Sequence, residues 1–398
     1  FSLSSPLRVR ISLLIASISA FRSSLTARSS RLTNSCTTFN NGSARPYIVE
    51  LVPYREGKVE VLVFNPEESW KSADVPVFLN PKAARVNRDV SVLVLSVLRP
   101  RDVLDGMTAS GIRGIRYFVE SGVPEIAFND VNPRAVDLAR RNAERHGVRV
   151  RFYREDFNVL CSREGFWAVD LDPFGSPAPF IWSAARAVRS GGYLLVSATD
   201  TRPLSGASPK QALAKYGVVL RKPEWYPELM ARVLYFLLFH AAAIHGKGIE
   251  PVLAFAYEHH VRVIARLRKK PSLITGNAKS IGFYELEGRV YGPVWKGPLH
   301  DRDVARGALA RWDRDYTRAS GKILELASVE PEVVGYYDVH VWAERLKLRR
   351  IPRFDAIISA LRERGFTAER VLWSDKGIKT DADEETFKSV LLELAGET

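Results

Sequence analysis

Apolar residues recur along most of the chain with two alternating periods, one typical of strands and one typical of helices. Residues 59–64 alternate as a hairpin strand would, and residues 87–98 have helical spacing. Short apolar runs then predict strands at residues 102–104, 126–128, 150–153, 167–171 and, after a turn at Gly191 and Gly192, 193–197. Helices are predicted between them, the first ending near Glu120 and the second running from Pro133 to His146. Short strands separated by such helices predict a mainly parallel sheet covered on both faces.

The chain is expected to have three parts. Residues 1–45 form a leader that is rich in Ser and Arg, starts with Phe1 and contains no acidic residue. We expect the leader to be disordered or to be upstream sequence from a misassigned start; a secretory signal and an organellar transit peptide are the alternatives. Residues 46–250 are expected to form an α/β domain, and residues 251–398 a smaller C-terminal domain.

Composition and charge narrow the class of protein. With 398 residues, 46% of them hydrophobic, the chain can build two packed cores. The formal net charge of the chain is +13. The leader contributes six positive charges, so residues 46–398 have a net charge of +7. This basic surplus favours a polyanionic partner. Its two cysteines, Cys36 and Cys161, exclude a disulfide framework and a four-cysteine zinc site, and they predict a reducing compartment. The apolar run at residues 229–244 is interrupted by Arg232 and predicts a buried helix rather than a membrane span.

Acidic residues follow the predicted strands, at the sheet edge where ligands of such folds bind. The turn after the first strand lacks the glycine spacing of a dinucleotide site, and its arginines stand where a pyrophosphate would need small residues. S-adenosylmethionine, with its sulfonium, amine and carboxylate, suits this turn. The expected contacts are Asp105 to the ammonium, Arg113 to the carboxylate, Asp130 to the ribose hydroxyls and Asp156 to the adenine amine. The alternative role for each strand-end acid is a helix cap.

The sequence VDLDPFGSP at residues 169–177 carries the candidate catalytic group. An exocyclic amine of a nucleobase is a poor nucleophile because its lone pair is delocalised into the ring, so a catalyst must accept its hydrogens. Asp172 can accept one N–H and the backbone carbonyl constrained by Pro173 the other, while Phe174 can stack on the base. The alternative is a tight strand-to-helix turn, for which these residue types are also suited.

The C-terminal third predicts a nucleic-acid contact. Helices at residues 339–346 and 353–364, followed by a hairpin at 366–380, give a winged-helix-like outline. Basic residues gather there, although a solvated helix face is the alternative: Lys347, Arg349, Arg350, Arg353, Arg362, Arg364, Lys376 and Lys379. The adjacent His259 and His260 have no carboxylate or cysteine at ligand spacing, so no metal site is expected.

Six segments together resemble the tRNA guanine-26 N2-dimethyltransferases, particularly those of archaea: residues 80–95, 105–116, 128–130, 170–177, 197–217 and 291–299. The resemblance implies a Rossmann-like class I methyltransferase with a smaller α+β, winged-helix-like C-terminal domain. It also implies transfer of one or two methyl groups from S-adenosylmethionine to the N2 amine of a tRNA guanine. Some relatives carry a four-cysteine zinc site in the second domain, which this chain lacks.

Site residues carry over from the resemblance by motif. Cofactor contacts would be Arg88, Arg113, Asp130, Asp156 and Phe157. Asp172 would be the catalytic carboxylate within the Asp172, Pro173 and Phe174 motif, and the target base would lie between Phe174 and Phe78.

Two other functions remain open at this point. One is an amino-methyltransferase with a different substrate, such as DNA adenine or a protein glutamine, because such enzymes use similar loops of an acid, a proline and an aromatic residue. The other is a non-catalytic RNA-binding protein that retains the fold. We expect a cytoplasmic monomer that binds tRNA and has neither a membrane segment nor a metal.

Overall fold

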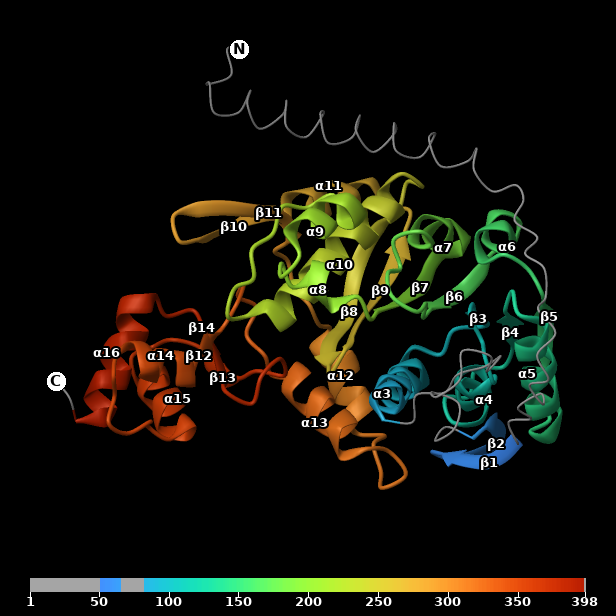
Figure 1. Ribbon diagram of the computed structural model, residues 1–398, viewed down its shortest axis with the longest axis horizontal. Coiled ribbons are helices and arrows are strands. Elements are labelled where there is room, and N and C mark those ends of the chain that lie inside the picture. Colours follow the sequence, from blue (N-terminus) through green and yellow to red (C-terminus); the bar gives the residue numbers. More distant parts are fainter. Residues whose placement is uncertain (1–50, 66–81, 397–398) are drawn as a thin grey trace, which may run out of the picture. The chain divides into compact units, whose positions relative to one another are not determined.

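The computed structural model describes residues 51–65 and 82–396, and within them the main element is a seven-stranded sheet of order β5-β4-β3-β6-β7-β9-β8 (Figure 1). The leader at residues 1–45 and Phe78 lie outside these ranges. The strands β3 to β7 are mutually parallel, and β9 and β8 run antiparallel at one edge. Their bounds are β3 (Val103–Asp105), β4 (Ile126–Asn129), β5 (Val150–Tyr153), β6 (Phe166–Leu171), β7 (Val188–Ala198), β8 (Gly248–Tyr257) and β9 (His260–Arg268). The predicted mainly parallel sheet is confirmed.

Helices cover both faces of the sheet, because alternate strand residues are apolar on both sides. Leu104 and Val169 point into a core shared with one group of helices: α6 (Phe157–Arg163), α7 (Ile181–Ala187) and α10 (Tyr226–Ala243). Val103 and Ala168, the preceding residues, point into a second core with the other group: α3 (Ala83–Leu98), α4 (Ile112–Val119), α12 (Arg302–Leu309) and α13 (Arg318–Ala327). α5 (Pro133–Arg145) also contributes to this second core through Ala143.

Two features of the sheet differ from expectation. The expected turn at Gly191 and Gly192 is wrong, because these residues lie within β7, where the pairing with β6 shifts register after Phe166. A Cβ added at Gly192 would lie 2.4 Å from the Trp167 carbonyl oxygen, so this irregularity needs glycine. The strands β8 and β9 extend the sheet, and the expected domain boundary at residue 250 falls inside β8.

Smaller elements complete the part of the chain that is described. The predicted hairpin strand is confirmed as β2 (Val59–Phe64), which pairs with β1 (Leu51–Glu56). A second hairpin consists of β10 (Ile281–Leu286) and β11 (Arg289–Trp295). The short helices α8 (Thr201–Leu204), α9 (Pro209–Tyr216) and α11 (Pro271–Lys279) lie in the connections.

The helix α10 confirms the prediction of a buried helix at residues 229–244. Its one arginine is accommodated by partners: Arg232 Nε lies 2.6 Å from Glu228 Oε1, and its other nitrogens donate to backbone carbonyls, including that of Val333 at 3.1 Å. A charged side chain can be buried when its donors are satisfied in this way. Among the described residues, none of the helices is long and apolar enough to cross a membrane.

The predicted order of helix, helix and hairpin is confirmed near the C-terminus. It consists of α14 (Val339–Arg345), α15 (Phe354–Glu363), β13 (Ala368–Arg370) and β14 (Gly377–Thr380), and β12 (Tyr337–Asp338) adds a third strand beside β14. The unpredicted α16 (Glu384–Ala395) contributes Phe387 to a separate core with Trp342 and Ile357.

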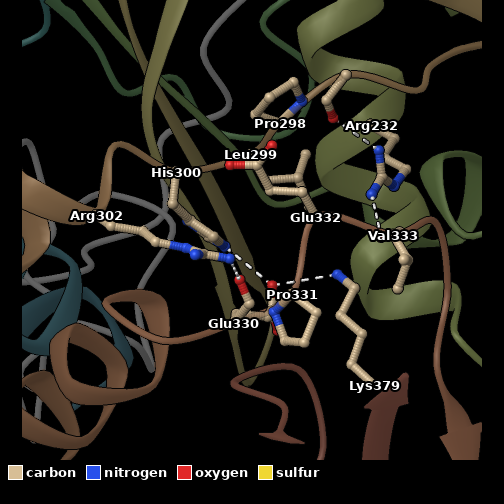
Figure 2. A pocket seen from close by; sticks show the side chains of 11 residues that line it. Arg232, Pro298, Leu299, His300, Arg302, Glu330, Pro331, Glu332, Val333 and Lys379 are labelled. Atoms are coloured by element: carbon tan, nitrogen blue, oxygen red, sulfur yellow. Dashed lines mark hydrogen bonds and ion pairs between the residues drawn. The ribbon is translucent and has the colours of Figure 1, made fainter. Parts of the chain in front are cut away.

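Lys379, which we predict to be among the basic residues facing a nucleic acid, is instead buried, and Figure 2 shows its amine directed at Glu330. Its Nζ lies 2.9 Å from Glu228 Oε2 and 3.2 Å from Glu330 Oε2. The Trp373 indole also donates to Glu330, at 3.1 Å, and His300 lies 3.1 Å from the same carboxylate. Burial alone would raise the pKa of Glu330, but Lys379 and His300 outweigh burial and lower the pKa below its usual range. Lys379 therefore joins β14 to α10 and is not exposed on a surface that a nucleic acid could contact.

We expect Lys379→Ala to lower the free energy of unfolding by about 3 to 5 kcal/mol, because it removes the lysine from the buried Glu330 carboxylate and leaves Glu228 with Arg232 alone. Urea denaturation at neutral pH measures this loss. The control is Lys388→Ala, which removes a partly exposed lysine and should change stability by less than about 0.5 kcal/mol. Equal stability of the two variants would contradict the structural role of Lys379.

Candidate functional site

A cavity of about 660 Å³ opens at the carboxyl ends of β3, β4, β5 and β6, where the sheet order reverses on either side of β3. This is the position at which open α/β sheets bind ligands. It brings together the predicted site residues of the described ranges: Arg88, Asp105, Arg113, Asp130, Asp156, Phe157, Asp172, Pro173 and Phe174. These residues come from several motifs that are far apart in the sequence, and the structure places all of them at one cavity.

The turn between β3 and α4 is hydrogen-bonded to the ends of the two neighbouring strands, β6 and β4. The Gly106 amide donates to the Asp170 carbonyl at 3.0 Å, and the Thr108 amide donates to the Asn129 carbonyl at 2.9 Å. A Cβ on Gly106 would lie 2.4 Å from the Phe157 ring, so only glycine fits there. At Gly106, therefore, the backbone itself lines the cavity.

Asp105 ends β3 and is buried beneath the turn. Its Oδ2 accepts hydrogen bonds from Thr108 Oγ1 at 3.0 Å and from the Gly114 amide at 3.1 Å. Burial raises the pKa of Asp105 to about 7, although Arg113 acts in the opposite direction. Asp105 is therefore largely protonated below neutral pH, and its expected contact with an ammonium group stays a prediction.

Asp130 and Asp156 hold backbone amides at the rim of the cavity. Asp130 accepts from the Ala109 amide at 3.0 Å through Oδ2 and from the Asn132 amide at 2.9 Å through Oδ1. Asp156 Oδ1 accepts from the first amides of α6, so the helix-cap alternative is correct for this residue. Capping fixes the carboxylate in place, and the ligand contacts expected for both residues remain predictions.

Arg113 connects α3 to the loop that follows β6. Its Nη1 donates to Asn87 Oδ1 at 3.0 Å, and its Nη2 donates to Asp172 Oδ2. Burial acts to raise the pKa of Asp172, but the guanidiniums of Arg113 and Arg262 outweigh burial and lower the pKa to about 2. Asp172 is therefore an anion at neutral pH, able to accept hydrogen bonds but too weak a base to keep a proton.

The loop after Asp172 presents an aromatic ring. The Gly175 amide donates to Thr199 Oγ1 at 2.8 Å, and the Thr199 amide donates back to the Gly175 carbonyl at 2.9 Å. Gly175 has a φ of 83°, a conformation that favours glycine. These constraints leave Phe174 85% exposed beside the cavity, although Pro173 is buried. An exposed phenylalanine at a cavity is suited to stacking on a planar ligand.

Two buried ion pairs behind the cavity were not predicted. Asp170 accepts hydrogen bonds from Arg262 of β9 at 2.9 and 2.6 Å, and it also lies 3.5 Å from Arg113. Arg88, expected to contact a cofactor, donates to both oxygens of Glu56 at 2.7 and 2.6 Å while also lining the cavity. The partners in both pairs are distant in sequence, so no local motif marks them.

The turn between β8 and β9 also reaches the cavity, with Glu258, His259 and His260 among its lining residues. The sequence alone predicts no metal site at these two histidines and gives them no other role. Within the described ranges, no cluster of three or more His, Cys, Asp or Glu side chains could hold a metal ion. The signal that could have placed them is the strand period on both sides of this turn, which predicts a hairpin.

The cavity thus offers fixed carboxylates, guanidiniums and an exposed ring, but no metal cluster among the described residues. An anionic Asp172 beside Phe174 can orient an amine on a planar base. Carboxylates at the strand ends can accept hydrogen bonds from hydroxyls and amines. The arrangement favours group transfer between two bound molecules, in which positioning supplies much of the rate.

Comparison with known proteins identifies relatives over most of the chain. Residues 57–285 and 268–392 match the family described as N2,N2-dimethylguanosine tRNA methyltransferase. A tRNA (guanine(26)-N(2))-dimethyltransferase of Methanospirillum hungatei is 35% identical over 375 residues, covering 86% of this chain and 100% of that protein. The enzyme of the same name from Pyrococcus abyssi is 34% identical over 380 residues, covering 86% and 99%.

A solved structure supports the same relationship. Trm1 from Pyrococcus horikoshii, in complex with S-adenosyl-L-methionine, has a TM-score of 0.78 and 31% identity, covering 86% of this chain and 100% of that chain. This similarity confirms the predicted class I, Rossmann-like methyltransferase fold with an additional C-terminal domain.

The raised pKa of Asp105 predicts that the free energy of unfolding falls as pH rises. The folded protein keeps a proton on this carboxyl up to a pKa of about 7, whereas an ordinary aspartate releases it near 3.8, so rising pH favours the unfolded state between these values. Between pH 5 and pH 8, the free energy of unfolding should change less in Asp105→Asn than in the wild type, by on the order of 2 kcal/mol. Urea denaturation at the two pH values measures this, with Asp137→Asn, at an exposed position, as the control. The same pH dependence in Asp105→Asn and the wild type would contradict the assignment.

Proposed function

Since the chain belongs to the N2,N2-dimethylguanosine tRNA methyltransferase family, we infer that it transfers one or two methyl groups from S-adenosylmethionine to the N2 amine of guanine 26 in tRNA. The observation that carries this function in the molecule itself is the anionic Asp172 beside the exposed Phe174, in the same cavity as the strand-end carboxylates. Family membership favours a tRNA guanine over DNA adenine or a protein glutamine. It also favours an enzyme over a non-catalytic RNA-binding protein.

We propose that the strand-end residues hold the cofactor. Arg113 would contact its carboxylate, Asp130 its ribose hydroxyls, and Asp156 with Phe157 its adenine. Arg88, which lines the same cavity, would be a further cofactor contact. The hydroxyl of Ser110 supports this fit, because it is buried at the cavity and has no hydrogen-bond partner in the described part of the chain. Gly106, which leaves no room for a side chain, allows a ligand to approach the backbone. When bound, S-adenosylmethionine supplies a methyl group on a sulfonium, which needs no further activation.

We propose that Asp172 orients the target amine. Its carboxylate would accept one N–H, and the carbonyl constrained by Pro173 would accept the other, so that the nitrogen lone pair turns out of the ring plane. The ion pair with Arg113 supports this role, since it keeps Asp172 charged and in one position. Phe174 would stack on the guanine. We propose Phe78 as the second flanking ring on the basis of the sequence alone, because it lies outside the described residues.

We propose that the C-terminal elements from β12 to α16 contact the tRNA body. Lys347, Arg350 and Arg353 support this proposal, because all three are exposed within a short stretch between α14 and α15. Extrusion of a stacked base costs a few kcal/mol, and phosphate contacts can offset this cost.

The sheet reaches Arg268, so the cofactor-binding part would include β8 and β9 in addition to residues 46–250. We further propose a cytoplasmic monomer, which the tRNA substrate and the low cysteine content support.

The direct test is mass spectrometry of tRNA nucleosides after incubation of the protein with S-adenosylmethionine. We expect N2-methylated guanosine with an unmodified tRNA transcript that has guanine at position 26. The matched control is the same transcript with adenine at this position. Equal methylation of the two transcripts would contradict the proposed target, and no methylation of either would contradict the proposed activity.

Asp172→Asn and Asp172→Ala should lower the single-turnover methyl transfer rate by about 10² or more, because the target amine loses its charged hydrogen-bond acceptor. Rapid-quench measurement with labelled S-adenosylmethionine gives the rate, and calorimetry checks that cofactor affinity changes by less than about threefold. Asp137→Asn, at an exposed helix position, is the control. A wild-type rate in either Asp172 variant would refute the proposed role.

Replacing Lys347, Arg350 and Arg353 together with Ala should weaken tRNA binding and make it less sensitive to salt. Removal of each cation that neutralises a phosphate should reduce the slope of log affinity against log salt concentration by about one. Filter-binding titrations at several salt concentrations measure this slope. The control is a double variant, Lys58→Ala with Arg306→Ala, whose exposed cations lie outside these elements and have acidic partners in Asp313 and Asp303. The proposal fails if the triple variant and the wild type have the same slope.

A further inference from the structure

The hairpin of β8 and β9 brings a histidine to the cavity from a region remote from the predicted motifs. β9 pairs antiparallel with β7, with Val261 opposite Ala198. The start of β9 therefore lies beside the carboxyl end of β7, at the sheet edge that carries the cavity. His260 is the first residue of β9 and lines the same cavity as Asp172. Its position is fixed by the register of the sheet rather than by a flexible loop.

Both ring nitrogens of His260 are buried, and neither has a hydrogen-bond partner in the residues that the structure describes. Buried polar atoms in native proteins are nearly always paired, so an unpaired imidazole at a cavity indicates a partner that arrives with a ligand. A neutral imidazole has one N–H donor and one lone pair. His260 thus presents an unused acceptor beside the carboxylate that we propose orients the amine.

The groups around His260 keep its ring neutral. Burial lowers its pKa below 6.5, and the guanidiniums of Arg113 and Arg88 add to this effect, whereas Asp172 and Glu258 act in the opposite direction. At neutral pH the ring therefore keeps its lone pair, and it can take up a proton when a stronger acid is formed beside it.

We propose that His260 accepts the proton that the N2 amine releases on methylation; this inference rests on the function proposed above. The amine nitrogen forms a bond to the methyl carbon while the carbon–sulfur bond breaks, and the electron pair of that bond passes to sulfur, leaving a neutral thioether. The nitrogen becomes positively charged and gives one N–H proton to the lone pair of the His260 ring. The imidazolium then releases this proton to water, which restores the acceptor for a second transfer.

Two carboxyl groups of the cavity, Asp172 and Asp105, are poorly suited to this step. Asp172, with a pKa of about 2, can accept a hydrogen bond from the amine but does not keep the proton. Asp105 uses Oδ2 to accept hydrogen bonds from Thr108 and Gly114 within the turn. The site therefore separates two tasks: Asp172 orients the amine, and His260 takes its proton.

The test compares His260→Gln with the wild type in single-turnover methyl transfer between pH 5 and pH 8.5. Glutamine can still form hydrogen bonds but cannot store a proton. We expect the wild-type rate to rise with pH to a plateau, since only the neutral ring is active, and the variant to be slower by about 10² on this plateau and to lack the rise. Asp105 titrates in both proteins, so the difference between the two profiles reports His260. The control is His245→Gln: burial also lowers the pKa of His245, but its ring bonds to the Trp182 carbonyl at 3.2 Å.

Two further measurements do not depend on turnover. In NMR titrations of histidine-labelled protein without cofactor, the His260 ring should have a pKa below 6.5, and Asp172→Asn should lower it further because a neighbouring anion is lost. Calorimetry and filter binding should show cofactor and tRNA affinities of His260→Gln within about threefold of wild type. If His260→Gln does not fold, His260→Asn replaces it in the rate comparison, and the wild-type titration still applies.

The proposal is overturned by profiles of the same shape, by a rate within about twofold of wild type, by a rate loss that weaker binding explains, or by a His260 pKa above 7. Absence of methyl transfer by the wild type would instead contradict the proposed function.

Discussion

The buried ion pair of Asp170 with Arg262 is the interaction on which the rest of the cavity depends. Both side chains are fully buried, and the carboxylate also lies 3.5 Å from Arg113. Removal of one partner from such a pair would leave an uncompensated charge in a low dielectric, at a cost of several kcal/mol. Three elements meet at this point: β6 carries Asp170, β9 carries Arg262 and α4 carries Arg113. The position of Arg113, and through it the charge of Asp172, follows from this arrangement.

The elements that the sequence predicts well are those with strong local signals. The strand at residues 150–153 has the bounds that its apolar run predicted, and the hairpin strand at 59–64 is also correct. The strand β7 was predicted too short, because its glycine pair looks like a turn, yet the sheet absorbs both glycines in a register shift. Local periodicity predicts a hairpin at β8 and β9, but it does not specify that this hairpin pairs with β7 and extends the sheet.

For the cavity residues, the sequence predicts position better than it predicts protonation state and bonding partners. Asp130 and Asp172 follow strands within recognisable motifs, and the structure places both at the cavity. Their protonation and partners could not be predicted: the low pKa of Asp172 depends on Arg113 and Arg262, which approach from other elements. Lys379 shows the opposite error, since composition alone assigns a lysine to the surface, whereas two glutamates from remote segments bury it.

The ion pair between Asp170 and Arg262 spans 92 residues of sequence. Its consequence concerns synthesis of the protein on the ribosome, where domains form as the chain emerges. A nascent chain that already displays the whole of residues 169–177 still lacks the cation that satisfies Asp170, and it lacks β9 beside β7. The cavity can therefore be completed only after β9 has left the exit tunnel, late in translation, and a fragment that ends between residues 177 and 262 has the predicted catalytic motif at residues 169–177 without an assembled site.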